Sequence, residues 1–312
     1  MSIEELALDS RRALVIGIGG GGDVIGCIPT ARFLRRLGVE VLLGGLTWER
    51  KVVDPLPGPR RVEELEGVVE VCERACLATP ETRTRHGTPL TESVVSACTG
   101  AEVLLLDVGG GVEGTKEALR CAMRKLEVDL VIGIDVGGDS LAMGDEKGVQ
   151  SPLADSIMLL SIAELGAPAA LGVIGYGSDG ELTPDELNRN IAWLMGRGAF
   201  LGAVGAVPED VEVMERIAER TATEASRLVV EAAKGKYGHC RIRKGSRRVF
   251  LTPMSVVTLY FLPEAVAEMS RIARIVRGTR SLEEADRLLR RHGYATELYY
   301  EERARGVEGE ER

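Results

Sequence analysis

The sequence predicts an α/β protein with a doubly wound, mostly parallel sheet between helical layers, a Rossmann-like three-layer arrangement. Apolar runs that end in glycine and aspartate alternate with helical stretches, which favours a parallel sheet covered on both faces. The runs are almost continuously apolar, as in strands that are buried on both sides. Residues 12–18, 39–45, 102–107, 129–135 and 169–174 form these runs.

The first run leads into a glycine cluster within RALVIGIGGGGDVIG (12–26), which also contains Asp23. Glycine has no Cβ atom, so a ligand can lie against the bare backbone, and consecutive N–H groups can bind an anion. Proline is tolerated in the first turn of a helix, so Pro29 predicts a helix that begins near Cys27 or Ile28. The predicted loop of about ten residues is longer than the tight turn of a dinucleotide-binding fold.

The middle of the chain alternates in the same way. Prolines at 55, 57 and 59 predict an irregular loop at the edge of the sheet, and the polar segment 79–89 is expected to be rich in turns. A short strand is expected at 68–72, and helices at 90–97, 115–126, 152–165, 184–196 and 208–233, the last as one long helix.

The pattern changes after Lys234. A hairpin that turns at 244–246, a strand at 255–263 and helices at 263–276 and 281–293 are expected. We therefore predict one α/β domain over 1–305, with a parallel-sheet core at 11–233, a hairpin and helices at 234–300, and a mobile tail at 305–312.

Composition excludes several classes of protein. The net charge of −9 argues against a nucleic-acid binder, because such proteins rely on cationic contacts to phosphates. No stretch is long and apolar enough to span a membrane, and the acidic N-terminus is unlike a signal peptide, so a cytoplasmic protein is expected. Few amides and many charges indicate a thermophile.

The six cysteines are scattered without a C-x-x-C pair, and three histidines provide no zinc pattern. Buried structural thiols are the expected role, since free cysteine behaves as a small hydrophobic residue. A disulfide stays open if the source is hyperthermophilic.

Ligands of open parallel sheets bind outside the carboxyl ends of the strands. Four loops after strands, at 17–26, 107–114, 135–144 and 175–181, place acidic side chains along that edge. These are Asp23, Asp107, Asp135, Asp139 and Asp179. So many carboxylates need a cation, a cationic ligand or raised pKa values to lie close together.

Three interpretations of these loops compete. GIGGGG (17–22) matches the dinucleotide motif G-x-G-x-x-G, but Glu49, the nearest acid to the ribose position, lies beyond the second strand, so neither NAD nor FAD is favoured. Alternatively, the glycines bind a phosphate or carboxylate while the aspartates hold Mg²⁺ or Mn²⁺. Finally, the aspartates are structural, as caps and turn residues.

We adopt the second interpretation: a metal-assisted hydrolase or lyase that acts on a small anionic metabolite. Asp135 and Asp139 are expected to ligate the metal or transfer protons, and Asp107 to support catalysis. The expected ligand-binding residues are Gly19, Gly20, Gly21, Gly22, Asp23, Gly109, Gly110, Gly137, Gly138, Ser151, Asp155 and Asp179. The rival class is a non-catalytic nucleotide- or metabolite-binding protein that uses the same loops.

The C-terminal hairpin carries a basic run: Arg241, Arg243, Lys244, Arg247 and Arg248. It is interpreted as a solvated face or subunit contact, or else as a flap that brings positive charge to an anionic substrate. The hairpin and C-terminal helices are also the elements expected to form a homodimer.

Three segments, GIGGGGDVIG, IDVGGDSLAMGDEKGVQSPLADSIML and TLYFLPEAV, resemble the domain of unknown function 1152 family, seen largely in archaea and actinobacteria. The resemblance covers about residues 12–300 and implies a small-molecule site, with no established activity to transfer. Residues 137–144, GGDSLAMG, are locally similar to the GG-x-E-x-G-M-G signature of D-glutamate cyclase, with different flanks. That similarity implies a carboxylate-binding, lyase- or hydrolase-like site near Asp139.

Overall fold

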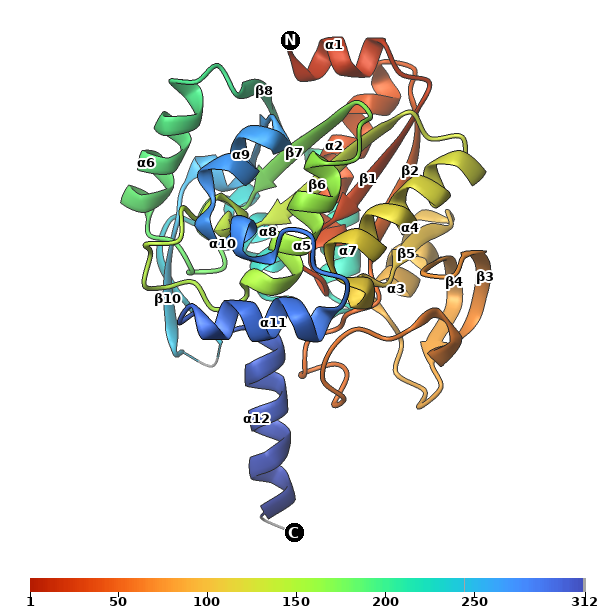
Figure 1. Cartoon of the computed structure of the whole chain (residues 1–312). Helices are drawn as coiled ribbons and strands as arrows, with labels where there is room; N and C mark the ends of the chain where they lie inside the picture. Colours follow the sequence, from red (N-terminus) through yellow and green to blue (C-terminus); the bar gives the residue numbers. More distant parts are fainter. Residues whose placement is uncertain (244, 311–312) are drawn as a thin grey trace.

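Five parallel strands form the centre of one large sheet in the computed structural model, which describes residues 1–243 and 245–310 (Figure 1). The strands of this sheet are β1 (Arg12–Gly17), β2 (Glu40–Leu46), β3 (Leu65–Cys72), β4 (Ala75–Thr84), β5 (Val103–Leu106), β6 (Leu130–Val136), β7 (Ala169–Ile174), β8 (Phe200–Gly205) and β11 (Val257–Phe261). Their order is β3-β4-β5-β2-β1-β6-β7-β11-β8. The predicted α/β fold class is confirmed.

In the parallel part, β5-β2-β1-β6-β7, the chain adds strands first on one side of β1 and then on the other. Strand β1 pairs with β2 on one side, with Ile16 opposite Gly44, and with β6 on the other, with Gly17 opposite Ile134. In such sheets the connections leave to opposite faces on either side of this point, which opens a crevice at the carboxyl ends of the two strands. The fold therefore places the loops after β1 and β6 at a natural ligand site.

Antiparallel strands complete both edges of the sheet. The turn-rich segment predicted at 79–89 instead contains the second half of β4, which pairs with the edge strand β3 and extends beyond the residues that pair with β5. Its polar residues include both buried and exposed side chains. Strand β8 was not predicted, and β11 lies between β7 and β8, so part of the segment 234–300 belongs to the main sheet.

Helices cover both faces of the sheet in two layers. One face packs against α1 (Ile3–Leu8), α2 (Asp23–Arg36), α3 (Thr91–Thr99), α7 (Pro208–Ala218) and α8 (Ala225–Ala233). The other face packs against α4 (Gly111–Lys125), α5 (Pro152–Ala163), α6 (Pro184–Met195), α9 (Pro263–Met269), α10 (Arg271–Val276) and α11 (Leu282–Arg291). This confirms the three-layer arrangement.

The start of α2 is the main correction to the predicted elements. The helix begins at Asp23, so Pro29 lies inside it and the loop after β1 is short. Gly26 lets this helix lie against the sheet, because a Cβ atom there would come within 2.4 Å of Val136 Cγ2. The burial of nine of the helix's residues outweighs the cost of about 3 kcal/mol for an interior proline.

Three other helix boundaries also differ from expectation. The long helix predicted at 208–233 is two helices, α7 and α8, and the one at 263–276 is broken at Ser270, whose hydroxyl caps α10 by accepting from the Ala273 N–H. Helix α4 begins at Gly111 rather than near Thr115. Side-chain caps and tertiary packing decide these ends, and periodicity alone does not reveal them.

The C-terminal hairpin, β9 (Gly238–Ile242) and β10 (Arg247–Leu251), forms a separate two-stranded sheet, as predicted. Residue 244 of its expected turn lies outside the described residues. The last described helix is α12 (Glu297–Glu310). Its first residues pack against the protein, with Glu297, Leu298 and Glu301 buried, and its C-terminal part projects away from the body of the protein (Figure 1). The backbone of the predicted tail is thus helical up to Glu310, while its mobility stays a prediction. In the described part of the chain, no helix is both long and apolar enough to cross a membrane.

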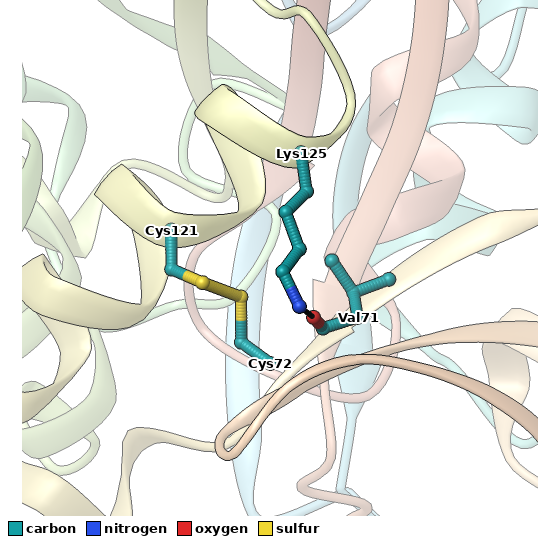
Figure 2. The surroundings of a disulfide bond; sticks show 4 residues. All are labelled: Val71, Cys72, Cys121 and Lys125. Carbon is teal, nitrogen blue, oxygen red and sulfur yellow. Dashed lines mark hydrogen bonds between the residues drawn. A yellow bond between two sulfur atoms is a disulfide. The ribbon is translucent and has the colours of Figure 1, made fainter.

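A disulfide joins Cys72 at the end of β3 to Cys121 in α4, across 49 residues of sequence (Figure 2). The ammonium group of Lys125, one turn further along α4, donates a hydrogen bond to the Val71 carbonyl at 2.6 Å. The expectation of free thiols is therefore wrong for these two cysteines, which tertiary contact brings together. Cys27 and Cys76 are buried free thiols, as expected.

Candidate functional site

A cavity of about 370 Å³ lies at the carboxyl edge of the sheet, where β1 and β6 meet. We call it the strand-edge cavity. Its wall is built from segments far apart in the sequence: the loop after β1, residues 49–53 after β2, the loop after β6, the start of α5, residues 222–226 at the start of α8, the hairpin and α12. This is where ligands of open α/β sheets bind.

The glycine loop forms one wall of the cavity with Gly19, Gly20, Gly21 and Gly22. The Gly19 N–H donates to Asp23 Oδ2 at 2.7 Å, and the Gly21 N–H donates to the Trp48 carbonyl at 2.9 Å. Gly20 and Gly21 have φ angles of +78° and +64°, which side chains with a Cβ rarely adopt. Among residues 1–243 and 245–310, the N–H groups of Gly20 and Gly22 meet no acceptor.

Three carboxylates meet beside this loop. Asp23 starts α2, Asp135 ends β6 and Asp155 lies in the first turn of α5, and one oxygen of each lies within 4.8 Å of the others. We call them the carboxylate trio. Asp155 is 4% exposed, and its Oδ1 atom has no hydrogen-bond partner among the described residues. The trio offers oxygen ligands at a spacing that a metal ion can bridge.

Burial raises the pKa of every member of the trio, and repulsion from other members adds to the rise for Asp23 and Asp155. For Asp155, burial is the main cause and the charges of Asp135 and Asp23 add to it. For Asp23, burial and the charge of Asp135 outweigh the Gly19 N–H and Arg50, so its pKa is well above the ordinary value. A bound divalent cation would reverse this effect, because it favours the ionised carboxylates.

Arg50 supplies positive charge next to the trio. Its guanidinium donates to the Gly19 carbonyl at 2.7 Å. Burial lowers its pKa, but the charges of Glu297, Glu301, Asp155 and Asp23 outweigh burial and raise it. One arginine thus lies among at least four acids, so the local balance stays negative.

A second group of acids follows β6 and β7. The Ser151 hydroxyl lies 2.6 Å from Glu181 Oε1 and 3.4 Å from Asp139 Oδ2. Burial and then the charges of Asp155, Glu181 and Asp179 raise the pKa of Asp139 well above its ordinary value. Burial and Glu181 raise the pKa of Asp179 to about 7. The raised pKa values favour the protonated forms of both aspartates.

Glu181 differs from these two aspartates because the protein neutralises it. Burial raises its pKa, but Arg247 and the Ser151 hydroxyl outweigh burial, so the pKa lies below the ordinary value. Its Oε2 atom accepts from the N–H groups of Gln150 at 2.6 Å and Ser151 at 3.0 Å. Glu181 therefore stays ionised and fixes the loop that leads into α5.

Most of the predicted site residues do come together. The residues that line the strand-edge cavity are Gly19, Gly20, Gly21, Gly22, Asp23, Asp135, Asp139, Ser151, Asp155 and Asp179. Gly137 and Gly138 lie directly behind it: a Cβ on Gly137 would come within 2.2 Å of Asp179 Oδ2, and the Gly138 N–H donates to Asp135 Oδ1 at 3.3 Å. Asp139 lies outside the trio, so of the two predicted metal ligands only Asp135 belongs to it.

Asp107, Gly109 and Gly110 do not line this cavity. Asp107 lies 2.7 Å from Arg74 Nη1 and accepts the Gly109 N–H at 2.7 Å. Gly110 instead borders a second hollow near the disulfide, which Arg74 also lines. Their predicted roles as catalytic and ligand-binding residues have no support from this placement.

The sequence prediction missed residues that come from distant parts of the chain. Glu297 of α12 lines the cavity and accepts the N–H groups of Leu153 at 3.0 Å and Ala154 at 2.7 Å, the first turn of α5. No local pattern links residue 297 to residue 153. Arg50 was detectable in principle, because it follows the end of β2 closely and strand ends build such sites.

Comparison with known proteins gives one family. The family described as "Protein of unknown function (DUF1152)" matches residues 14–305, which confirms the resemblance seen in the sequence. Searches of curated proteins and of solved structures found no match. The local similarity to D-glutamate cyclase stays a prediction.

Proposed function

The chain belongs to the DUF1152 family of proteins of unknown function, and we propose that it is a metal-assisted hydrolase or lyase acting on a small anionic metabolite. The observation that carries this proposal is the carboxylate trio, whose oxygens lie within 4.8 Å of one another at the carboxyl edge of the sheet. Hard cations such as Mg²⁺ and Mn²⁺ prefer carboxylate oxygens and keep positions open for water and substrate.

Asp155 gives independent support to this metal site. Its buried Oδ1 atom has no hydrogen-bond partner within the described residues, and an unsatisfied buried carboxylate oxygen is costly. A cation held by Asp23, Asp135 and Asp155 would supply the missing partner. When bound, such a cation polarises a substrate oxygen or lowers the pKa of a bound water.

Proton transfer is assigned to Asp139 and Asp179. Both line the same cavity, and both have pKa values raised chiefly by burial, that of Asp179 to about 7. A group that is partly protonated near neutral pH serves as general acid or base in hydrolysis and in elimination. The N–H groups of Gly20 and Gly22, at the N-terminal end of α2, are assigned to the anionic group of the substrate.

A dinucleotide is still disfavoured, for a reason other than the one in the sequence. The corrected start of α2 makes the loop as short as a dinucleotide site requires. However, the Gly19 and Gly21 N–H groups already donate to Asp23 and to Trp48, so two donors of the glycine loop are taken within the protein and cannot bind a pyrophosphate. The proposed function therefore favours neither NAD nor FAD.

The same proposal places the enzyme in the cytoplasm of a thermophile as a homodimer formed through the hairpin and C-terminal helices. The dimer is tested by size-exclusion chromatography with light scattering, and a monomeric mass would remove it.

The function is tested on EDTA-stripped protein in a thermal-shift screen of Mg²⁺ and Mn²⁺, each alone and then with nucleotides, sugar phosphates or acidic amino acids. A ligand at about a hundred times its dissociation constant adds roughly 2.7 kcal/mol of stability. We expect a shift with metal that grows with one class of anion, followed by metal-dependent product formation detected by mass spectrometry. No shift with either metal would overturn the proposal. Tight binding of an anion without formation of a product would instead support the rival class, a non-catalytic binding protein.

A further inference from the structure

The hairpin that contributes to the wall of the strand-edge cavity forms a separate two-stranded sheet. It packs on α8 through a separate apolar cluster of Leu228, Ile242, Val249 and Leu251, and its two strands pair only with each other within the described chain. Residues 222–226, at the start of α8, line the cavity as well, and the Ser226 hydroxyl donates to the Gly22 carbonyl at 2.8 Å. The hairpin is therefore fixed over the glycine loop.

Arg243, the residue that follows β9, belongs to the wall of the cavity. Its φ angle is +51°, a conformation that only one other non-glycine residue, Glu127, adopts in the described chain. Such backbone strain persists where surrounding contacts hold it, and it is concentrated at functional positions. The Arg243 N–H donates to Glu224 at 2.8 Å, and its carbonyl accepts from the Ser246 hydroxyl at 2.7 Å.

The Arg243 guanidinium pairs with Glu181 and keeps further N–H donors for a second partner. Its Nη2 atom lies 3.1 Å from Glu181 Oε1, while 41% of the side chain stays exposed. Glu181 is also satisfied by Arg247 at 3.4 Å, whose side chain is only 10% exposed, and by the Ser151 hydroxyl. A guanidinium has five N–H donors, so Arg243 has further donors for another anion without leaving Glu181 unpaired.

We infer that Arg243 is a specificity-determining residue that binds the anionic group of the substrate, a carboxylate or a phosphate, from the hairpin side of the strand-edge cavity. This inference rests on the proposed function. The fork of a guanidinium matches two oxygens of either group, whereas an ammonium acts as a point charge. Arg50 is less suited to this role, because its guanidinium is engaged with Gly19 and is surrounded by protein carboxylates.

The arginines of the hairpin's basic run therefore differ in their location relative to the cavity. Arg243 lines the cavity and Arg247 is a buried partner of Glu181, but Arg241 and Arg248 are exposed and do not line it. Of the two interpretations of this run, a flap that brings positive charge to the substrate therefore applies to Arg243. Arg241, two residues earlier in β9, provides a matched control in the same hairpin.

The test compares wild-type protein with Arg243→Gln, Arg243→Lys and Arg241→Gln. Isothermal titration first measures the affinity of each EDTA-stripped protein for Mn²⁺, and then the affinity of the Mn²⁺-saturated protein for inorganic phosphate and for malonate. We expect Arg243→Gln to weaken binding of at least one anion tenfold or more, with an Mn²⁺ affinity within twofold of wild type. Arg243→Lys should recover only part of the loss, and Arg241→Gln should match wild type.

The two anions distinguish a phosphate substrate from a carboxylate one, according to which of them depends on Arg243. Unchanged affinity for both anions in Arg243→Gln, an equal loss in Arg241→Gln, or no anion binding by the wild type would overturn the inference. Mn²⁺ binding by the wild type would then still support the metal site. Absence of Mn²⁺ binding by the wild type would instead count against the proposed function itself.

Discussion

Asp107 and Asp155 lie on two parts of the same sheet edge, and their surroundings differ sharply. Both are buried, with 2% and 4% exposure. Asp107 lies 2.7 Å from the Arg74 guanidinium and accepts a backbone N–H, so these partners oppose the rise in pKa that burial causes. Asp155 has Asp135, Asp23 and Glu297 around it, whose charges add to the rise that burial causes, while Arg50 opposes the rise.

The two aspartates thus differ in whether the protein itself supplies partners for their carboxylate oxygens. Around Asp107 the protein supplies the cation and the N–H donor, and the adjacent Cys72–Cys121 disulfide ties this region together. Around Asp155 one buried oxygen lacks any partner within the described chain. A buried carboxylate is costly unless it is paired or coordinates a metal, which is why we propose that a cation binds at Asp155.

The largest expected effect on stability is on the Asp107 side. The double substitution Cys72→Ala and Cys121→Ala opens a loop of 49 residues and should lower the free energy of unfolding by about 4 kcal/mol. Urea denaturation measures this loss. Metal affinity should not change, because the disulfide and the trio line different hollows. A loss of metal binding in this variant would show that the Asp107 and Asp155 regions are not independent of each other.

Neutralising the two aspartates should change stability in opposite directions. In metal-free protein at pH 8, Asp107→Asn removes an ion pair with Arg74 and should cost about 1–3 kcal/mol. Asp155→Asn removes repulsion from Asp23 and Asp135 and should stabilise by roughly 1 kcal/mol. Thermal denaturation of both variants checks the signs, and destabilisation by both would contradict the comparison.

A smaller effect is expected from pH. The pKa of Asp179 is about 7 in the folded protein and about 4 in the unfolded chain. The stability from its protonated form is fully present below about pH 4 and is lost as the pH rises through 7. In metal-free protein, the advantage of Asp179→Asn over wild type should therefore grow by about 1 kcal/mol or more between pH 5 and pH 8. An advantage that is constant or shrinks would show that Asp179 titrates normally.

The sequence revealed the parts of the fold and site that depend on local pattern. Apolar runs and their closing glycines located the five parallel strands, and the loops after β1, β6 and β7 delivered Asp23, Asp135, Asp139 and Asp179 to one cavity. Pro29 misplaced the start of α2, because the close packing that Gly26 permits overrides the local preference of proline.

The remaining features depend on long-range contact. Nothing near Asp107 in the sequence indicates that Arg74 neutralises it, and nothing near Ser151 indicates that Glu297 caps α5. The same holds for the pairing of Cys72 with Cys121. Asp107 and Asp155 therefore acquire their opposite surroundings only when the chain folds.

The most direct test of the metal site is an isothermal titration of EDTA-stripped protein with Mn²⁺, comparing wild type, Asp155→Asn and Asp107→Asn. The account predicts saturable binding by the wild type, affinity within threefold for Asp107→Asn, and at least a hundredfold weaker binding for Asp155→Asn, which removes one charged ligand of the trio. Binding by Asp155→Asn as tight as that of the wild type would contradict it.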